Sequence, residues 1–170
     1  QMESVDWTGI DFRLYGIWGS VTPGTPLFKH IRWTPEGSIL VNNAFIAHFY
    51  ASAAISLNIH RDGGAGSFSV NPRVAEVAAC GGFLLTDHRP ELERIFPGVE
   101  VPMFDPHTPG DLERQIRWWL ARPDARRSVA AQLNAAVMTA VLTETFDARV
   151  QTLFAALNEH SYVAAAGGVS

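Results

Sequence analysis

The chain has 170 residues, of which 47% are hydrophobic and 18% are charged, so it is not intrinsically disordered and can form one domain with a sizeable core. Its 13 Lys and Arg against 17 Asp and Glu give a net charge of −4, which disfavours binding to nucleic acid through overall charge. We expect no transmembrane segment, because no apolar run approaches the ~20 residues that a membrane helix needs. The single cysteine and the lack of a basic-then-apolar leader lead us to expect a cytoplasmic protein.

Apolar segments of strand length alternate with amphipathic segments of helix length, which is typical of a parallel sheet covered on both faces. The predicted strands are residues 12–17, 31–33, 55–59, 83–86 and 99–104. The predicted helices are residues 41–53, 72–80, 90–96 and 111–121, followed by two or three more within residues 124–160. We therefore predict an α/β, Rossmann-like three-layer domain over residues 1–162, with a sheet of about five strands and extra C-terminal helices. Residues 163–170 are predicted to form a disordered tail.

Ligands of open parallel sheets bind beyond the carboxyl ends of the strands, so the segments that follow the strands hold the candidate site. The first such segment, G-I-W-G-S at residues 16–20, would let backbone amides at Gly16 approach a ligand. Its spacing differs from the G-x-G-x-x-G dinucleotide motif, and a tight turn explains it equally well.

The second segment leaves the strand at residues 55–59, continues through His60 and Arg61, and crosses a glycine-rich stretch to Asn71. A helix predicted to start there offers unpaired N–H groups that favour a diphosphate, with Arg61 and Arg73 as cationic helpers. The alternative is that His60 only caps the strand and that both arginines are solvated. The sequence leaves these two interpretations open.

Glu76 is a lone carboxylate among small and apolar residues on the helix predicted over residues 72–80. Such a glutamate is costly unless it faces a cleft and accepts hydrogen bonds, for example from the vicinal hydroxyls of a ribose. The alternative is an ion pair with Arg73, three residues earlier on the same helix. Cys80 is expected to pack as a small apolar residue rather than to act as a nucleophile.

These segments carry a resemblance to a known family. The run N-P-R-V-A-E-V-A-A-C-G-G-F-L-L-T-D at residues 71–87, preceded by A-I-S-L-N-I-H-R, resembles the carboxy-terminal domain of group 1 glycosyltransferases of the GT-B fold. It is most similar to the spore-maturation-protein-like branch, in which L-N-x-x-R ends one strand, R-x-x-E-x-x-A-C-G follows, and T-D ends the next strand. T-F-D-A-R at residues 145–149 is similar to the family's H-T-Y-x-x-R segment, except that Glu144 replaces the histidine.

The resemblance implies that Glu76 holds the ribose of a nucleotide-diphosphate-sugar donor. The family's first acidic position falls on Phe68, which is not acidic, so Ser69 and Asn71 are expected to supply polar contacts instead. Transfer needs stabilisation of the leaving diphosphate, which backbone amides, Arg61 and Arg73 are suited to give. We therefore expect an enzyme that uses no metal or other cofactor, and the resemblance implies that it is a retaining one.

A GT-B enzyme binds its acceptor mainly through an N-terminal domain, and we expect that partner domain to be missing from this chain. The isolated domain should then bind the donor nucleotide without turnover. Two alternatives remain open at this point. One is an epimerase-type GT-B relative that acts on nucleotide sugars, and the other is a non-catalytic interaction module of the same fold with a degenerate site.

Overall fold

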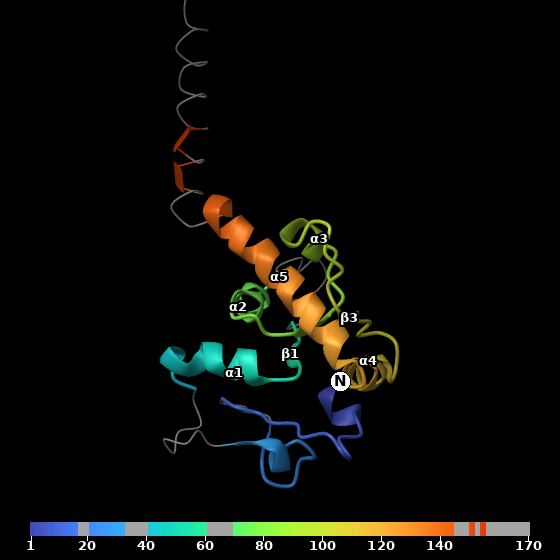
Figure 1. Ribbon diagram of the computed structural model, residues 1–170. Helices are drawn as coiled ribbons and strands as arrows, with labels where there is room; N and C mark the ends of the chain where they lie inside the picture. The colour runs from blue at the N-terminus through green and yellow to red at the C-terminus, as the bar shows by residue number, and fades with distance from the viewer. Residues whose placement is uncertain (17–20, 33–40, 61–69, 145–149, 152–153, 156–170) are drawn as a thin grey trace, which may run out of the picture.

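The computed structural model describes residues 1–16, 21–32, 41–60, 70–144, 150–151 and 154–155 (Figure 1). Three short 3₁₀ helices lie in its N-terminal part, at Met2–Ser4, Phe28–His30 and Asn43–Phe45. The strands are β1 (Ser56–Asn58), β2 (Leu84–Asp87) and β3 (Met103–Phe104). The helices are α1 (Ile46–Ser52), α2 (Arg73–Ala79), α3 (Leu92–Ile95), α4 (Asp111–Leu120) and α5 (Pro123–Glu144).

The three strands form one parallel sheet in the order β1-β2-β3. Ser56 pairs with Leu84 across β1 and β2, and Asp87 pairs with Phe104 across β2 and β3. Helical segments connect the strands, as parallel pairing requires. The predicted parallel α/β arrangement is confirmed and is compatible with a Rossmann-like domain.

The described residues form three strands, and the five that the sequence predicts are not shown. Within the described residues, the first two predicted strands meet at an isolated parallel bridge between Leu14 and Ile31. Leu14 donates to the carbonyl of His30 and accepts from the amide of Arg32, and the described residues of the two segments pair no further. The 3₁₀ helix Phe28–His30 directly before Ile31 prevents the pairing from continuing in that direction, because its backbone is not extended.

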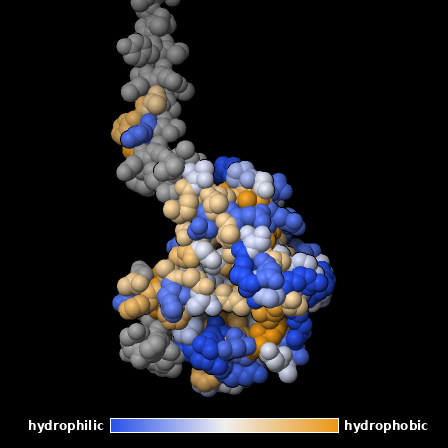
Figure 2. Space-filling model, viewed as in Figure 1, coloured by the Kyte–Doolittle hydropathy of each residue, from blue (hydrophilic) through white to orange (hydrophobic). Residues whose placement is uncertain are grey.

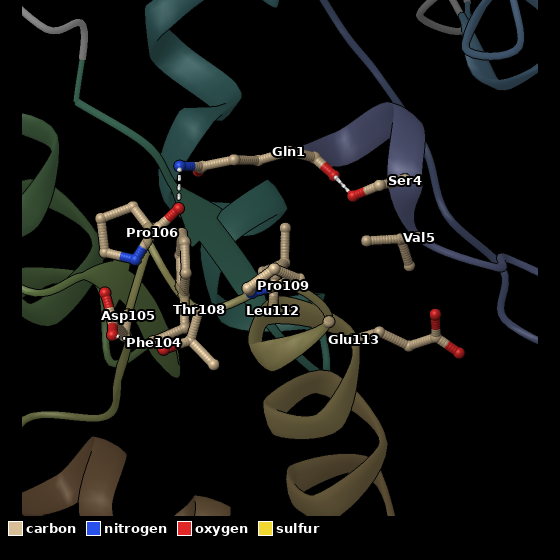
Figure 3. Close-up of a pocket in the computed structure, with 11 residues that line it drawn as sticks. Gln1, Ser4, Val5, Phe104, Asp105, Pro106, Thr108, Pro109, Leu112 and Glu113 are labelled. Carbon is tan, nitrogen blue, oxygen red and sulfur yellow. Dashed lines mark hydrogen bonds between the residues drawn. The ribbon is translucent and has the colours of Figure 1, made fainter.

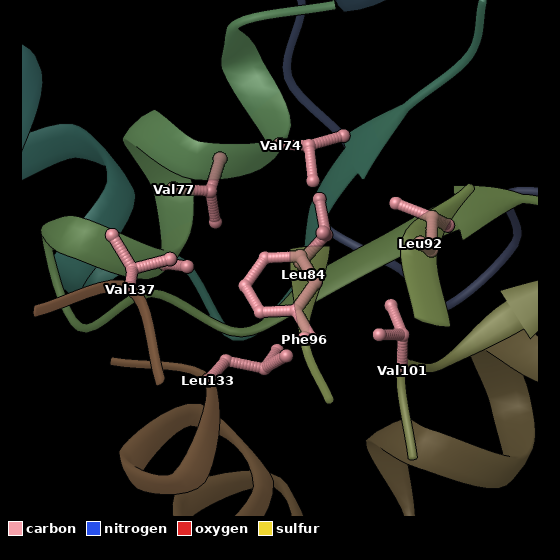
Figure 4. Packing of buried hydrophobic residues seen from close by; sticks show 9 residues of the cluster. Val74, Val77, Leu84, Leu92, Phe96, Val101, Leu133 and Val137 are labelled. Carbon is pink, nitrogen blue, oxygen red and sulfur yellow. The ribbon is translucent and has the colours of Figure 1, made fainter. Parts of the chain in front are cut away.

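Strand β2 organises the core, because successive side chains of a strand point to opposite faces of the sheet. On one face, Leu84 packs with Val77 of α2, Phe96 after α3, and Leu133 and Val137 of α5. Figure 4 shows Leu84 and Phe96 at the centre of this cluster, with residues of α2 and α5 around them. This face is therefore covered by α2, α3 and α5.

The opposite face is covered by α4 and by the N-terminal segment. Here Leu85 of β2 and Phe104 of β3 pack with Leu112 and Ile116 of α4 and with Val5. Helices and the chain end thus enclose a sheet whose central strand is buried along its whole length.

A close turn joins α2 to β2. Gly81 has φ +71°, which favours glycine, and Gly82 lies so close to α1 that a Cβ there would approach the Tyr50 carbonyl oxygen to 2.7 Å. Across the same turn, Asn134 of α5 donates to the carbonyl oxygens of Ala78 and Ala79 at 2.9 and 3.0 Å. These contacts hold α1, α2 and α5 together at the amino edge of β2.

The two or three helices predicted within residues 124–160 begin as one helix, α5, which has 22 residues. Its sequence is rich in Ala and contains no glycine after Pro123, so nothing interrupts the helix before Glu144. Residues 163–170, the predicted tail, lie outside the described residues. Among the described helices, none combines the length and apolar character that crossing a membrane requires.

The surface is mixed in polarity. Figure 2 shows hydrophilic side chains over much of one face, with smaller hydrophobic areas between them. Large apolar side chains with substantial exposure include Phe28, Phe45, Trp118 and Met138. The Arg122 guanidinium covers the Trp118 ring at 4.0 Å from its centroid, which reduces the apolar surface there.

Candidate functional site

Four polar side chains are buried at the carboxyl ends of β1 and β2: Asn58, His60, Thr86 and Asp87. Buried polar groups require hydrogen-bond partners, and these four largely satisfy one another. Asn58 Nδ2 donates to Thr86 Oγ1 at 3.1 Å, which joins the two strands through their side chains. The carboxyl edge of the sheet therefore carries a polar network inside an apolar core.

Asp87 is the centre of this network. Its Oδ1 accepts hydrogen bonds from the His60 backbone amide at 3.0 Å and from His60 Nδ1 at 2.6 Å. Its Oδ2 accepts from the Nε of Arg89 at 3.0 Å and forms an ion pair with the same guanidinium. Because this carboxylate is only 3% exposed, these donors replace the water that it would otherwise bind.

The environment of Asp87 keeps it ionised. Burial alone would raise the pKa of this carboxyl, but the hydrogen bonds from His60 and Arg89 outweigh it. The pKa of Asp87 is therefore below its ordinary value of 3.8. At neutral pH, the group is a carboxylate that only accepts hydrogen bonds.

Asn71 links this network to the start of α2. Its backbone amide donates to His60 Nε2 at 3.1 Å, and its Nδ2 donates to Asn58 Oδ1 at 3.0 Å. Its own Oδ1 is buried and has no hydrogen-bond partner among the described residues. Of the residues predicted for the site, the structure thus brings His60 and Asn71 into direct contact.

Arg73 and Glu76 lie on α2, two and five residues after Asn71, and both side chains are exposed. The described residues include no ion pair between Arg73 and Glu76. The structure therefore does not show the ion pair that the sequence left open as the alternative role of Glu76. Tyr50 of α1 lies beside both groups: burial raises the pKa of its phenol, the Arg73 charge opposes this, and the Glu76 charge adds to it. A guanidinium, a carboxylate and a phenol therefore gather where α1 packs on α2.

A small pocket opens at the carboxyl end of β3 (Figure 3). It has a volume of about 190 Å³ and is lined by the N-terminal segment, the loop after β3 and the start of α4. Asp105 and Glu113 contribute carboxylates, but both already accept hydrogen bonds from neighbouring protein groups. The pocket is smaller than the ~300 Å³ or more of typical small-molecule sites, so it does not enclose a whole nucleotide sugar.

The other predicted residues stand apart or are not placed. Gly16 follows the bridge at Leu14 and has φ +109°, a conformation that favours glycine, while residues 17–20 lie outside the described residues. Arg61 and Ser69 also lie outside them, so the structure does not test these two. Cys80 is a free, partly buried thiol just after α2. The described residues contain no group of three or more His, Cys, Asp and Glu side chains arranged to hold a metal ion.

Sequence reasoning assigned no role to Asn58, Thr86, Asp87, Arg89 or Tyr50. A signal was present for three of these residues: Asn58 ends one apolar strand, and Thr86 and Asp87 end the next. Polar residues at the ends of neighbouring buried strands must find partners, and in a parallel sheet those ends are adjacent. For Tyr50 and Arg89, no pattern in the sequence shows which groups they meet.

Comparison with known families agrees with this geometry. A family model described as "Glycosyl transferase-like" matches residues 2–155, which includes the whole sheet and the polar network. The chain belongs to this glycosyl transferase-like family. No curated protein and no solved structure matches the chain. Membership in the glycosyl transferase-like family supports a glycosyltransferase-type function, with a nucleotide sugar as the expected class of donor.

Proposed function

We propose that this chain is the donor-binding domain of a GT-B glycosyltransferase and that it binds a nucleotide-diphosphate sugar at the carboxyl edge of β1 and β2. The observation that carries the proposal is the buried network of Asn58, His60 and Asp87, which holds Asn71 directly before α2. In parallel α/β domains, this edge is where ligands bind. The same residues lie in the motif that resembles the spore-maturation-protein-like branch.

In the proposed complex, Glu76 accepts hydrogen bonds from the ribose hydroxyls, and Arg73 neutralises charge on the diphosphate. Both side chains are exposed and do not pair with each other. A ligand can therefore bind to them without breaking an Arg73–Glu76 ion pair. A guanidinium close to the leaving diphosphate stabilises the charge that develops as the anomeric bond breaks. We propose that Gly16, Arg61 and Ser69 complete the site. Gly16 follows Leu14, and Arg61 and Ser69 lie outside the described residues.

The proposal includes transfer with retention and without a metal ion. Retention follows from the resemblance, and metal independence follows from the resemblance together with Arg73 in the first turn of α2. We further propose that a second, acceptor-binding domain supplies the other side of the cleft, so that this chain alone binds donor without transferring sugar.

The proposal can be tested by calorimetric and thermal-shift titration of the full chain with UDP, GDP, ADP and dTDP. A ligand that binds only the native state raises its apparent stability, so both methods report the same event. We expect one nucleotide to bind and Glu76→Ala to weaken it by about tenfold, which matches the loss of one or two hydrogen bonds to a charged group. Addition of EDTA should leave the affinity unchanged.

Glu100→Ala is the matched control, because Glu100 is exposed and precedes β3, at the opposite edge of the sheet. This variant should bind the nucleotide as the wild type does. Absence of binding by the wild type at millimolar nucleotide would contradict a donor-binding function. Equal affinity of Glu76→Ala and the wild type would contradict the role of Glu76.

A further inference from the structure

The two ring nitrogens of His60 have different partners, and these partners determine where its proton lies. Nδ1 is 2.6 Å from a carboxylate oxygen of Asp87, which accepts hydrogen bonds. Nε2 is 3.1 Å from the backbone amide of Asn71, which can only donate. The arrangement is complete when His60 is neutral, with the proton on Nδ1 and the lone pair of Nε2 directed to Asn71.

Asn71 is consequently held at two points by residues of the sheet edge. His60 Nε2 holds its backbone amide, and Asn58 Oδ1 holds its side-chain Nδ2. Asn58 is itself fixed by Thr86 of β2. The remaining polar atom of the side chain, Asn71 Oδ1, is the one without a partner among the described residues. It is an acceptor that no described residue uses.

The charged groups around His60 are few. Asp87 faces it from the end of β2, with Arg89 on the far side of the carboxylate. Asn71 faces it from the segment before α2, and Asn58 of its own strand is uncharged. Arg61, the next residue in sequence, lies outside the described residues. A proton on Nε2 would place two N–H groups, those of His60 and Asn71, against each other.

We propose that His60 is a positioning residue for donor binding: as a neutral imidazole held by Asp87, it fixes Asn71 at the sheet edge and so presents Asn71 and the start of α2 to the donor. This inference rests on the proposed function and adds a determinant that the resemblance does not assign. His60 itself is 8% exposed, so it acts through Asn71 rather than by touching the donor. Its role is lost when Nε2 no longer accepts a hydrogen bond.

Two substitutions of His60 separate positioning from packing. The side-chain amide of His60→Gln reaches the place of Nε2, so its oxygen can accept the Asn71 amide. The amide of His60→Asn reaches only the place of Nδ1, so it can keep the Asp87 contact but not the contact with Asn71. Both variants replace a buried imidazole by a smaller neutral amide, and urea unfolding followed by circular dichroism compares their stabilities.

The measurement is the dissociation constant of each variant for whichever of UDP, GDP, ADP and dTDP binds the wild type most tightly. We expect His60→Gln to bind within about threefold of the wild type and His60→Asn to bind about tenfold more weakly, as the loss of one buried hydrogen bond implies. Equal affinities of the two variants, or the reverse order, would overturn the proposal while leaving the donor-binding function intact. No binding by the wild type would instead overturn the function and the inference together.

Asn71→Ala provides a second test if either His60 variant does not fold. It removes the side-chain bond to Asn58 and the free Oδ1 but leaves the backbone bond to His60. We expect about a tenfold loss of nucleotide affinity, since the positioning bond to Asn58 is removed. Affinity within threefold of the wild type would show that the positioned Asn71 side chain does not serve the donor.

Discussion

His60 and Asp87 are 27 residues apart in sequence, yet Nδ1 of one lies 2.6 Å from Oδ1 of the other at the carboxyl edge of the sheet. The contact joins the ends of β1 and β2 through buried side chains. It fixes the polar side chains at these two strand ends relative to each other, and His60 in turn accepts a hydrogen bond from the backbone amide of Asn71. The stability of this edge and the proposed donor site therefore depend on the same residues.

Asp87→Asn should destabilise the fold strongly. Four N–H groups of His60 and Arg89 converge on the carboxylate, and a neutral amide cannot accept from all of them while its own NH₂ also needs acceptors. We expect a loss of about 3 kcal/mol in the free energy of unfolding at pH 7, as for other broken buried pairs. Urea unfolding measures it. Glu100→Gln, an exposed substitution with the same charge change, should cost less than about 0.5 kcal/mol.

The stabilisation from the Asp87 carboxylate should also depend on pH. The pKa of this group is lower in the folded chain than its ordinary value of 3.8, so the stabilisation is fully present above that value. It is lost as the pH falls through the folded pKa. The stability difference between wild type and Asp87→Asn should therefore shrink from about pH 5 toward pH 2. A difference that grows in this range would show that the carboxyl is not ionised in the folded chain.

Gly82→Ala should be destabilising because of a steric conflict. An added Cβ would lie 2.7 Å from the Tyr50 carbonyl oxygen, and backbone cannot move away as a flexible side chain can. We expect a loss of roughly 1–3 kcal/mol, the usual cost of overpacking. Ala75→Ser, on the exposed surface of α2, is the control. A stability change of the same small size in both variants would mean that α1 does not approach the turn so closely.

Asn134→Ala should weaken the attachment of α5 to α2. The substitution removes two hydrogen bonds to the carbonyl oxygens of Ala78 and Ala79, at the end of α2. The expected loss is about 1–2 kcal/mol, because two hydrogen bonds are lost and the one to Ala78 is partly buried. Gln132→Ala changes an exposed residue of the same helix and should stay within about 0.5 kcal/mol of the wild type. Equal values for the two variants would contradict the attachment.

Leu133→Ala should cost about 2–5 kcal/mol, because Leu133 is fully buried against Leu84 and Phe96 and truncation leaves a cavity. Met138→Ala, five residues later on α5, should cost far less, since the Met138 side chain is 53% exposed. Chemical denaturation of both variants gives the comparison. Similar losses of stability in the two variants would contradict the orientation of α5, in which Leu133 faces the core and Met138 faces solvent.

Hydrophobic periodicity was sufficient to predict the three strands that form the sheet and the helices between them. Leu84 and Leu85 lie in an unbroken apolar run bounded by glycine and by Asp87, which is typical of a strand buried on both faces. The segment around Leu14 carried a similar local signal but formed only one bridge. Pairing depends on what the partner segment does, and the 3₁₀ helix before Ile31 is not visible as a period in the sequence.

The candidate site was predictable in its location but not in its connections. Parallel topology indicated the carboxyl edge, and the motif around Asn71 and Glu76 indicated the relevant helix. That Asp87 is the centre of the network depends on the register of β1 against β2, which places Asn58 opposite Thr86. Local sequence does not encode this register. The sequence motif therefore included Asp87 but did not indicate what it binds.

The most direct test of donor binding at this edge is to follow backbone amide signals of the full chain by NMR during titration with the best-binding nucleotide. We predict that the largest shifts occur at Asn58–His60, around Asn71 and in the first turn of α2, with little change at the pocket formed by Ser4, Asp105 and Gly110. Shifts concentrated at that pocket, or no shifts at millimolar nucleotide, would contradict a donor site at the ends of β1 and β2.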